Sequence, residues 1–203
     1  MNGMTDENSK TLEAYESKFV EYVTVTIDTV QGSMKEWLDA AVKGLPFDAE
    51  ILEIGSGSGR DAKYLQSQGY AVHCSDVPKG FLAILEAQGF DTQQLNIVTD
   101  EIKGSYDLVL ANAVLLHFTD DDMHNVLRKI YASLHPNGRL AFSLMKGKGS
   151  RWTDNKIDAP RYFNYWEQDE LEKLLRKIGF KNVDIQIATN SKGVEWLMVV
   201  TSK

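Results

Sequence analysis

The strongest constraint on the fold comes from a short apolar run that ends in three glycines at alternate positions, ILEIGSGSGRDA at residues 51–62. A strand that enters a helix through such a loop exposes bare backbone and the unpaired N–H groups of the helix N-terminus to a ligand. The dinucleotide fingerprint G-x-G-x-x-G would place its last glycine at position 60, which is Arg60. Glu53, at the strand tip, would repel a pyrophosphate and suit a positively charged group. The stretch therefore predicts a site for a nucleoside with a cationic part.

Helical and strand-like segments alternate along the chain, which predicts an α/β layered fold. Several strand candidates are continuous apolar runs, as in parallel strands that are buried on both faces. The predicted strands are 51–54, 71–75, 92–97, 107–111, 139–144, 183–188 and 195–201, and the predicted helices are 11–23, 26–42, 60–67, 79–87, 121–134 and 167–178. A turn is expected at 136–138. Residues 146–165 have no clear period and are expected to form a long loop.

Length, net charge and cysteine content limit the classes of protein to which the chain could belong. At 203 residues and 43% hydrophobic content, one domain spanning 1–203 is expected. The net charge of −7 argues against binding to nucleic acid or to an anionic membrane surface. Cys74 is the only cysteine, which excludes an internal disulfide and indicates a reducing compartment, so a cytoplasmic monomer or homodimer is expected. No apolar stretch approaches the ~18 residues that a membrane span needs. No His, Cys or carboxylate positions have the spacing of a metal site.

Four motifs follow one another in the order typical of one enzyme family. Glu53 precedes the glycines, Asp76 ends the next strand in VHCSDVP, Asn96 lies in QLNIVTD, and YDLVLANAVLLHF contains the fourth strand. From about residue 15 to its end, the chain resembles the class I S-adenosylmethionine-dependent methyltransferases. The resemblance implies S-adenosyl-L-methionine as the cofactor. It also implies a three-layer, Rossmann-like α/β fold with a seven-stranded, mostly parallel sheet whose last strand is antiparallel.

The resemblance also assigns roles to residues. Asp76 would accept hydrogen bonds from both ribose hydroxyls, and Asn96 would take the place of the family's usual aspartate beside the adenine amine. The N-terminal helices, residues 1–45, would form a lid that places Tyr15 over the cofactor. The expected cofactor-binding residues are Tyr15, Glu53, Gly55, Ser56, Gly57, Gly59, Asp76, Val77, Asn96, Ile97, Asn112 and Ala113. Taken singly, each feature also has a structural explanation, such as helix capping or a tight turn.

Methyl transfer requires a base only if the acceptor must lose a proton. The candidate is His117 in LLHFTDDD, because an imidazole has a suitable unperturbed pKa of ~6.5. Its setting is similar to that of the catalytic histidine in plant small-molecule O-methyltransferases. A structural histidine that caps the strand end or bonds the Thr119–Asp120 turn is the alternative.

The segment 146–165 is the candidate substrate loop. Between residues 146 and 161 it carries five basic residues against two aspartates, which suggests contact with an anionic acceptor, although a solvated loop is the alternative. The cluster RYFNYW that follows would either line the acceptor pocket or pin the loop to the sheet. The expected substrate residues are Arg151, Arg161, Tyr162 and Tyr165. An RxFNxY-like stretch and the pair Trp196–Leu197 resemble a bacterial subgroup of small methyltransferases, some of them labelled tellurite-resistance-like.

Together these features predict a metal-independent methyltransferase that acts on an oxygen or nitrogen atom of a small molecule. Three alternatives stay open. One is an oxidoreductase that uses NAD, against which the misplaced third glycine argues. A second is a module that binds S-adenosylmethionine without turnover. The third is an enzyme that methylates RNA or protein.

Overall fold

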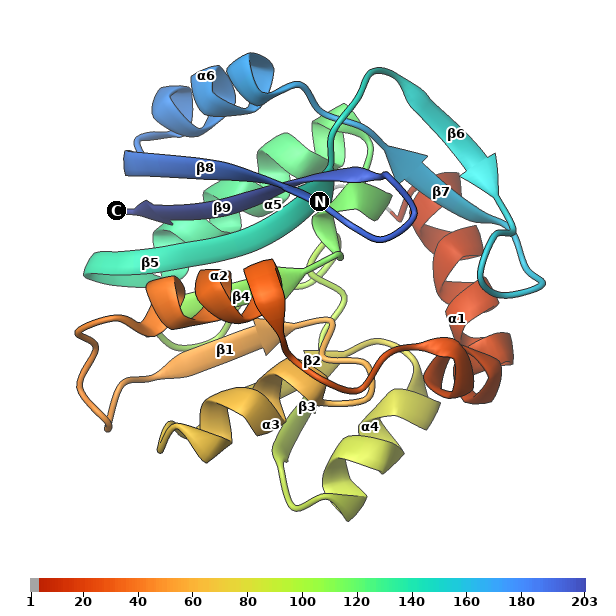
Figure 1. Ribbon diagram of the computed structural model, residues 1–203, viewed down its shortest axis with the longest axis horizontal. Coiled ribbons are helices and arrows are strands. Elements are labelled where there is room, and N and C mark those ends of the chain that lie inside the picture. Colours follow the sequence, from red (N-terminus) through yellow and green to blue (C-terminus); the bar gives the residue numbers. More distant parts are fainter. Residues whose placement is uncertain (1–3) are drawn as a thin grey trace.

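A seven-stranded sheet forms the centre of the protein in the computed structural model, which describes residues 4–203 (Figure 1). Its strands are β1 (Ile51–Ile54), β2 (His73–Asp76), β3 (Asp91–Gln94), β4 (Tyr106–Asn112), β5 (Leu134–Met145), β8 (Lys181–Thr189) and β9 (Glu195–Ser202). The strand order is β3-β2-β1-β4-β5-β9-β8, and β9 is antiparallel to β5 and β8 whereas the other neighbours are parallel. The predicted Rossmann-like α/β fold is therefore confirmed. The order reverses between β1 and β4, where open α/β sheets bind their ligands.

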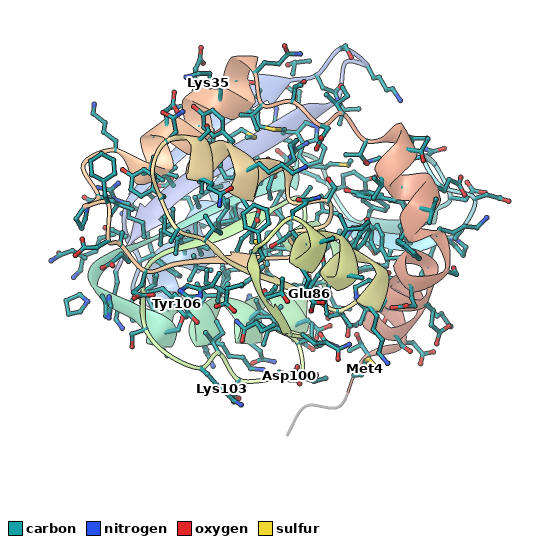
Figure 2. The ribbon with its side chains drawn as sticks, turned by 90° about the horizontal axis from the view of Figure 1, so that it is seen from below. Met4, Lys35, Glu86, Asp100, Lys103 and Tyr106 are labelled. Atoms are coloured by element: carbon teal, nitrogen blue, oxygen red, sulfur yellow. The ribbon has the colours of Figure 1, made fainter. Side chains whose placement is uncertain are left out.

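Within residues 4–203, five helices cover the two faces of the sheet, which gives three layers: α2 (Gly32–Val42), α3 (Arg60–Ser67), α4 (Lys79–Ala87), α5 (Asp120–Ser133) and α6 (Gln168–Ile178). The helix α1 (Asp6–Val25) lies instead at the carboxyl ends of the parallel strands, and a 3₁₀ turn, η1 (Leu115–His117), follows β4. One core contains Leu38, Leu65 and Leu85 from α2, α3 and α4, and the opposite core contains Leu127 and Leu175 from α5 and α6. Figure 2 shows α2 and α5 on opposite sides of the sheet. None of the helices within residues 4–203 combines the length and apolar character needed to cross a membrane.

The two N-terminal helices differ from the expected ranges. The first begins at Asp6 rather than residue 11, because the Thr5 side chain accepts a hydrogen bond from the N–H of Asn8 and caps the helix. The second begins at Gly32 rather than residue 26. The residues between them include the β-branched Ile27, and β-branched side chains lose rotamer freedom in helices. The first three residues of the predicted 1–45 lid lie outside the described residues.

The segment 146–165, expected as a loop, contains a second, two-stranded sheet. β6 (Ser150–Thr153) pairs antiparallel with β7 (Arg161–Asn164), so the expectation of a structureless loop is wrong. The two strands have only four residues each and are seven residues apart, which is too short a pattern to show a period. β7 lies beside α1, where the N–H of Tyr162 donates to Thr11 Oγ1 at 3.1 Å (Figure 1).

Candidate functional site

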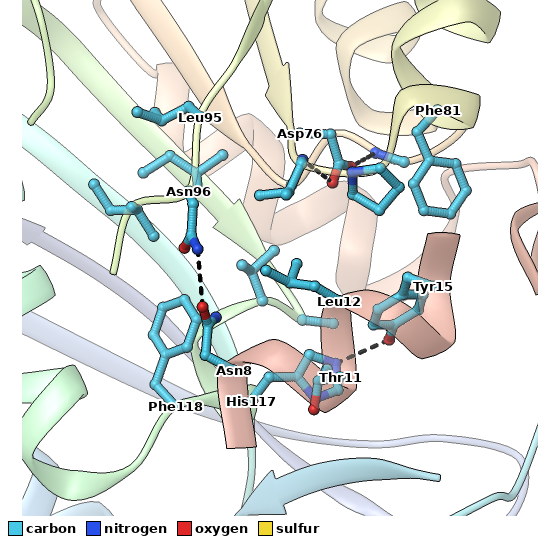
Figure 3. A pocket seen from close by; sticks show the side chains of 18 of the residues that line it. Asn8, Thr11, Leu12, Tyr15, Asp76, Phe81, Leu95, Asn96, His117 and Phe118 are labelled. Carbon is cyan, nitrogen blue, oxygen red and sulfur yellow. Dashed lines mark hydrogen bonds between the residues drawn. The ribbon is translucent and has the colours of Figure 1, made fainter. Parts of the chain in front are cut away.

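A cavity opens at the carboxyl ends of β1, β2 and β4, and α1 covers it (Figure 3). The predicted site residues that line it are Tyr15, Gly55, Gly57, Asp76, Val77, Asn96, Ile97, Asn112, Ala113 and His117. The predicted residues that are not part of its lining are Glu53, Ser56, Gly59, Arg151, Arg161, Tyr162 and Tyr165. Residues from distant motifs therefore meet at the point where the strand order reverses.

The glycine loop fits closely between the sheet and its neighbours. Gly55 and Gly59 have φ values of +68° and +80°, a region that residues with a side chain rarely adopt. A Cβ at Gly55 would lie 2.4 Å from Val114 Cγ2, and one at Gly59 would lie 2.9 Å from Leu85 Cδ2. Ser56 ties the loop to β2, since its N–H donates to the carbonyl of Ser75 at 2.9 Å. The loop therefore brings unobstructed backbone to the cavity wall.

Asp76 ends β2 with its carboxylate at the cavity. Its two oxygens accept hydrogen bonds from the N–H groups of Gly57 and Val77, both at 2.8 Å. Burial raises the pKa of Asp76 to about 6, against the lowering effect of these two donors. Each carboxylate oxygen has a further lone pair, so the group can accept hydrogen bonds from a vicinal diol.

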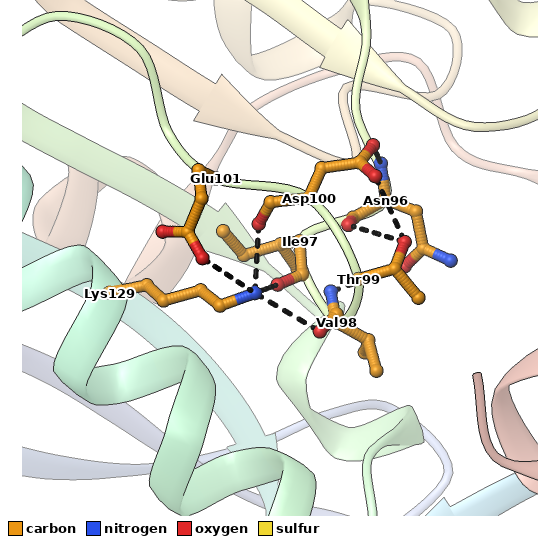
Figure 4. A network of polar contacts seen from close by, with 7 residues as sticks. All are labelled: Asn96, Ile97, Val98, Thr99, Asp100, Glu101 and Lys129. Carbon is orange, nitrogen blue, oxygen red and sulfur yellow. Dashed lines mark hydrogen bonds and ion pairs between the residues drawn. The ribbon is translucent and has the colours of Figure 1, made fainter. Parts of the chain in front are cut away.

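Asn96 is held in place by a network around its loop. Its N–H donates to Asp100 at 2.9 Å, and its side-chain Nδ2 donates to Asn8 Oδ1 of α1 at 2.9 Å. Lys129 on α5 fixes the same loop, because its ammonium group donates to the carbonyls of Ile97, Val98 and Asp100 at 2.8–3.2 Å (Figure 4). The loop thus presents an amide group to the cavity in a fixed orientation.

Glu53 lies behind the glycine loop, on the sheet face that α2 and α3 cover. It is 2% exposed, and its Oε2 has no hydrogen-bond partner within residues 4–203. Burial, and then the nearby Asp61, raise the pKa of Glu53 well above the ordinary value. An unpaired buried carboxyl group of this kind is stabilised by a cationic ligand group.

His117 connects α1 to the hairpin formed by β6 and β7 through two hydrogen bonds. Its Nδ1 lies 2.6 Å from the carbonyl oxygen of Tyr162 and its Nε2 lies 2.9 Å from the hydroxyl of Tyr15. Because a carbonyl can only accept, Nδ1 carries the proton and Nε2 accepts from Tyr15. The Tyr15 oxygen also accepts from Arg161 Nη1 at 3.2 Å. Burial lowers the pKa of His117 to about 4, so the imidazole is neutral at neutral pH.

Two of the four predicted substrate residues contact residues of the cavity wall, and the other two contact each other. Arg161 is 3% exposed and contacts Tyr15, and the backbone of Tyr162 contacts His117. Arg151 is exposed and Tyr165 is half-buried against the core, and Arg151 Nε donates to the Tyr165 hydroxyl at 2.7 Å, with its guanidinium 5.0 Å from that ring. Phe163 is part of the main core, so the aromatic cluster does pin the hairpin to the sheet.

Several site residues were not expected from the sequence. Asp61 is 4% exposed, pairs with Arg60 at 2.7 Å and accepts from Asn112 Nδ2 at 2.6 Å. Asn8 and Thr11 also line the cavity. With Tyr15 they lie three and four residues apart, on one face of α1. A stripe of polar and aromatic side chains on the buried face of a helix could have identified them.

The polar groups that line the cavity distinguish between possible nucleoside ligands. The cavity offers a carboxylate at Asp76, an amide at Asn96 and bare backbone at Gly55 and Gly57. None of the described residues that line it is Lys or Arg, the side chains that bind phosphate. The cavity therefore fits S-adenosylmethionine, which has a diol, an adenine and a sulfonium but no phosphate.

Comparison with known proteins agrees with this fit. A family model described as a methyltransferase domain matches residues 28–185. The structure is similar to that of Burkholderia thailandensis 1,6-didemethyltoxoflavin-N1-methyltransferase with bound 1,6-didemethyltoxoflavin and S-adenosylhomocysteine, with a TM-score of 0.78 and 23% identity over 100% of this chain and 91% of that chain. It is also similar to the [4+2]-cyclase SpnF, with a TM-score of 0.75 and 13% identity over 100% and 97% of the two chains. At these identities the likeness shows the fold alone, and one fold hosts several chemistries.

A polyketide synthase-nonribosomal peptide synthetase of Phaeosphaeria nodorum is 30% identical over 162 residues, which is 66% of this chain. The match spans 4% of that much longer relative. The tellurite-resistance-like subgroup stays a prediction. Because the family model covers most of the sequence, the chain belongs to the methyltransferase-domain family and is a class I S-adenosylmethionine-dependent methyltransferase.

Proposed function

We propose that this enzyme transfers the methyl group of S-adenosylmethionine to an oxygen or nitrogen atom of a small molecule. The observation that supports the proposal is the set of polar groups in the cavity beneath α1, which suits a nucleoside with a cationic group and, among residues 4–203, contains no Lys or Arg side chain that would bind phosphate. The chemistry that this cofactor supplies is an electrophilic methyl group on a sulfonium. The net charge of −7 supports a small-molecule acceptor over a nucleic acid.

The residues would share the work of binding as follows. Asp76 would accept from the ribose hydroxyls, with Val77 beside it, and Asn96 and Ile97 would contact the adenine. The loop from Gly55 through Ser56 and Gly57 to Gly59 would leave room for the amino-acid part. Glu53 would stabilise positive charge from behind the loop. Asn112 and Ala113, at the end of β4, would border the methyl group.

His117 is the proposed base if the acceptor has to lose a proton. It is neutral and lies in the cavity wall, but its lone pair at Nε2 already accepts from Tyr15. A proton from the acceptor would therefore reach His117 through the Tyr15 hydroxyl, or directly after this bond opens. Burial, and to a smaller extent the positive charge of Arg161, disfavour a protonated imidazole, so the role requires a negative charge close to His117 while it holds the proton.

The same proposal includes the arrangement of the whole chain. Residues 1–203 would act as one methyltransferase domain, with residues 1–45 as lid and 146–165 as substrate loop. A monomer or homodimer in the cytoplasm is proposed from the size of the chain and from its single cysteine, Cys74, which is buried and free.

Calorimetric titration with S-adenosylmethionine, S-adenosylhomocysteine and NAD tests the proposal. We expect micromolar dissociation constants for the two adenosyl ligands, about −8 kcal/mol, and no binding of NAD. Binding of NAD without the adenosyl ligands would refute it. With binding established, a panel of small hydroxyl and amine compounds, compared between wild type and His117→Ala, identifies the acceptor atom. Saturating cofactor binding without methylation of any acceptor would favour the non-catalytic module.

A further inference from the structure

A second cavity adjoins the cofactor cavity on the side of the sheet that α2 covers. The two cavities share Tyr22, Asn112 and Ala113. The rest of its lining comes from the end of α1, from α2, the start of α3, β5, the hairpin, and β8 and β9, and includes Arg60, Lys156, Met34, Asn190, Trp196 and Met198. A ligand here would lie next to the end of β4.

The charges of the two cavities are opposite. The cofactor cavity has Asp76 and no cationic side chain, whereas the second cavity has Arg60 and Lys156 and no described carboxylate in its lining. Arg60 uses Nε and Nη2 to bind Asp61, and its Nη1 makes no hydrogen bond within residues 4–203. It can therefore donate to a second anion.

Lys156 has no anionic partner of its own. Among residues 4–203, no carboxylate lies within 4.0 Å of its ammonium group, which instead lies 3.9 Å from the centre of the Tyr22 ring. Lys156 has a φ of +82°, an unfavourable conformation for a residue with a side chain. Burial, together with the positive charges of Arg161 and Arg60, lowers the pKa of Lys156 to about 8. A cation held in this way is stabilised when an anion binds beside it.

The rest of the wall suits a flat or apolar body. Trp196, Met34 and Met198 provide a polarisable surface, and Asn190 adds an amide group. This combination of an apolar wall and a few converging polar groups is typical of sites for small molecules.

We propose that the second cavity binds the methyl acceptor, and that the acceptor is a small aromatic or apolar molecule with an oxyanion, a carboxylate or a phosphonate, which Lys156 and Arg60 bind. This inference rests on the proposed function and specifies its substrate class. It also moves the recognition of the acceptor from Arg151 and Tyr165, which line neither cavity, to Lys156 at the tip of the hairpin.

The test uses benzoate, phenylphosphonate and neutral benzamide as probes, titrated by calorimetry into the full chain saturated with S-adenosylhomocysteine. We expect both anions to bind and benzamide to bind at least about tenfold more weakly. Lys156→Gln should weaken the binding of both anions by about tenfold or more, and Lys156→Arg should restore it. The control is Lys148→Gln, at an exposed lysine of the same segment, which should leave the affinity for both anions unchanged. Thermal unfolding confirms that each variant is folded.

Three outcomes would overturn the inference. The first is an absence of anion binding at millimolar concentration, and the second is equal binding of benzamide and benzoate. The third is that Lys156→Gln weakens the binding of S-adenosylhomocysteine but not that of 5′-methylthioadenosine, which lacks the amino-acid tail. Lys156 would then bind the carboxylate of the cofactor. If S-adenosylhomocysteine does not bind the wild type, the proposed function fails. In that case the anion titrations are run without S-adenosylhomocysteine, and they still show whether the second cavity binds oxyanions.

Discussion

Lowering the pH from about 7.5 to about 5 should weaken the binding of 5′-methylthioadenosine by about tenfold, or ~1.4 kcal/mol. The reason is Asp76, whose pKa burial raises to about 6 while the N–H groups of Gly57 and Val77 oppose the rise. Only the ionised carboxylate can accept from two ribose hydroxyls and keep both backbone bonds. Ligand binding selects the ionised form, so the affinity is full above the pKa of the free protein and falls as the pH drops below it. At about pH 5, roughly one tenth of Asp76 is ionised.

Calorimetry at constant ionic strength measures this change. The ligand lacks the amino-acid tail, which removes any contribution from a charge beside Glu53. At about pH 7.5, Asp76→Asn should bind about tenfold or more weakly than the wild type, because an amide cannot accept all four hydrogen bonds. Its affinity should no longer depend on pH, so the difference from the wild type should shrink by about tenfold at about pH 5. An affinity that stays constant in the wild type, or that falls equally in Asp76→Asn, would refute the assignment of the ribose to Asp76.

Three further predictions concern the surroundings of the cofactor. Because the buried Glu53 has an unpaired Oε2 and a raised pKa, the binding of S-adenosylmethionine should lower that pKa and release protons. Calorimetry in two buffers of different ionisation enthalpy measures the release, and Glu53→Gln should abolish it. Gly80→Ala should destabilise the protein, whereas the same change in an open helix stabilises by up to about 1 kcal/mol, because the new Cβ would lie 2.5 Å from the ring of Phe19. Urea unfolding measures the free energy of unfolding of both proteins, and a value for Gly80→Ala equal to or above that of the wild type would contradict the packing of α1 on α4. Tyr15→Phe leaves Nε2 of His117 without its donor, so about 1–3 kcal/mol of stability should be lost and the amides of α1 should exchange faster. Unchanged exchange rates would mean that this bond does not hold α1.

The parts of the site that the sequence predicts are those in which a local rule decides the structure. The apolar run before Gly55 can only be a buried strand, and the glycines require positive φ, so strand, loop and helix follow from twelve residues. Asp76 and Asn96 then lie near the loop because parallel strands end at the same edge of a sheet. The meeting of these residues in one cavity is thus a consequence of the topology.

The parts that the sequence did not predict depend on contacts between distant segments. The strands of the hairpin have four residues each, and their pairing is stabilised by packing on α1, which no local pattern encodes. The position of Lys156 in a second cavity depends on α2 and β9, which are far away in the sequence. The neutral state of His117 likewise results from burial under α1 rather than from its neighbours in LLHF.

The bonds between α1 and the hairpin have a consequence for the timing of catalysis. Thr11 accepts from the backbone of Tyr162, and Glu21 accepts from the N–H of Asp158 at 3.1 Å, so the two segments are fastened to each other as well as to the sheet. We expect a nucleoside beneath α1 to leave when these bonds break together with the one between Tyr15 and His117. We therefore predict that cofactor exchange is a cooperative opening on the microsecond to millisecond scale of lid motions, and that product release is slower than methyl transfer.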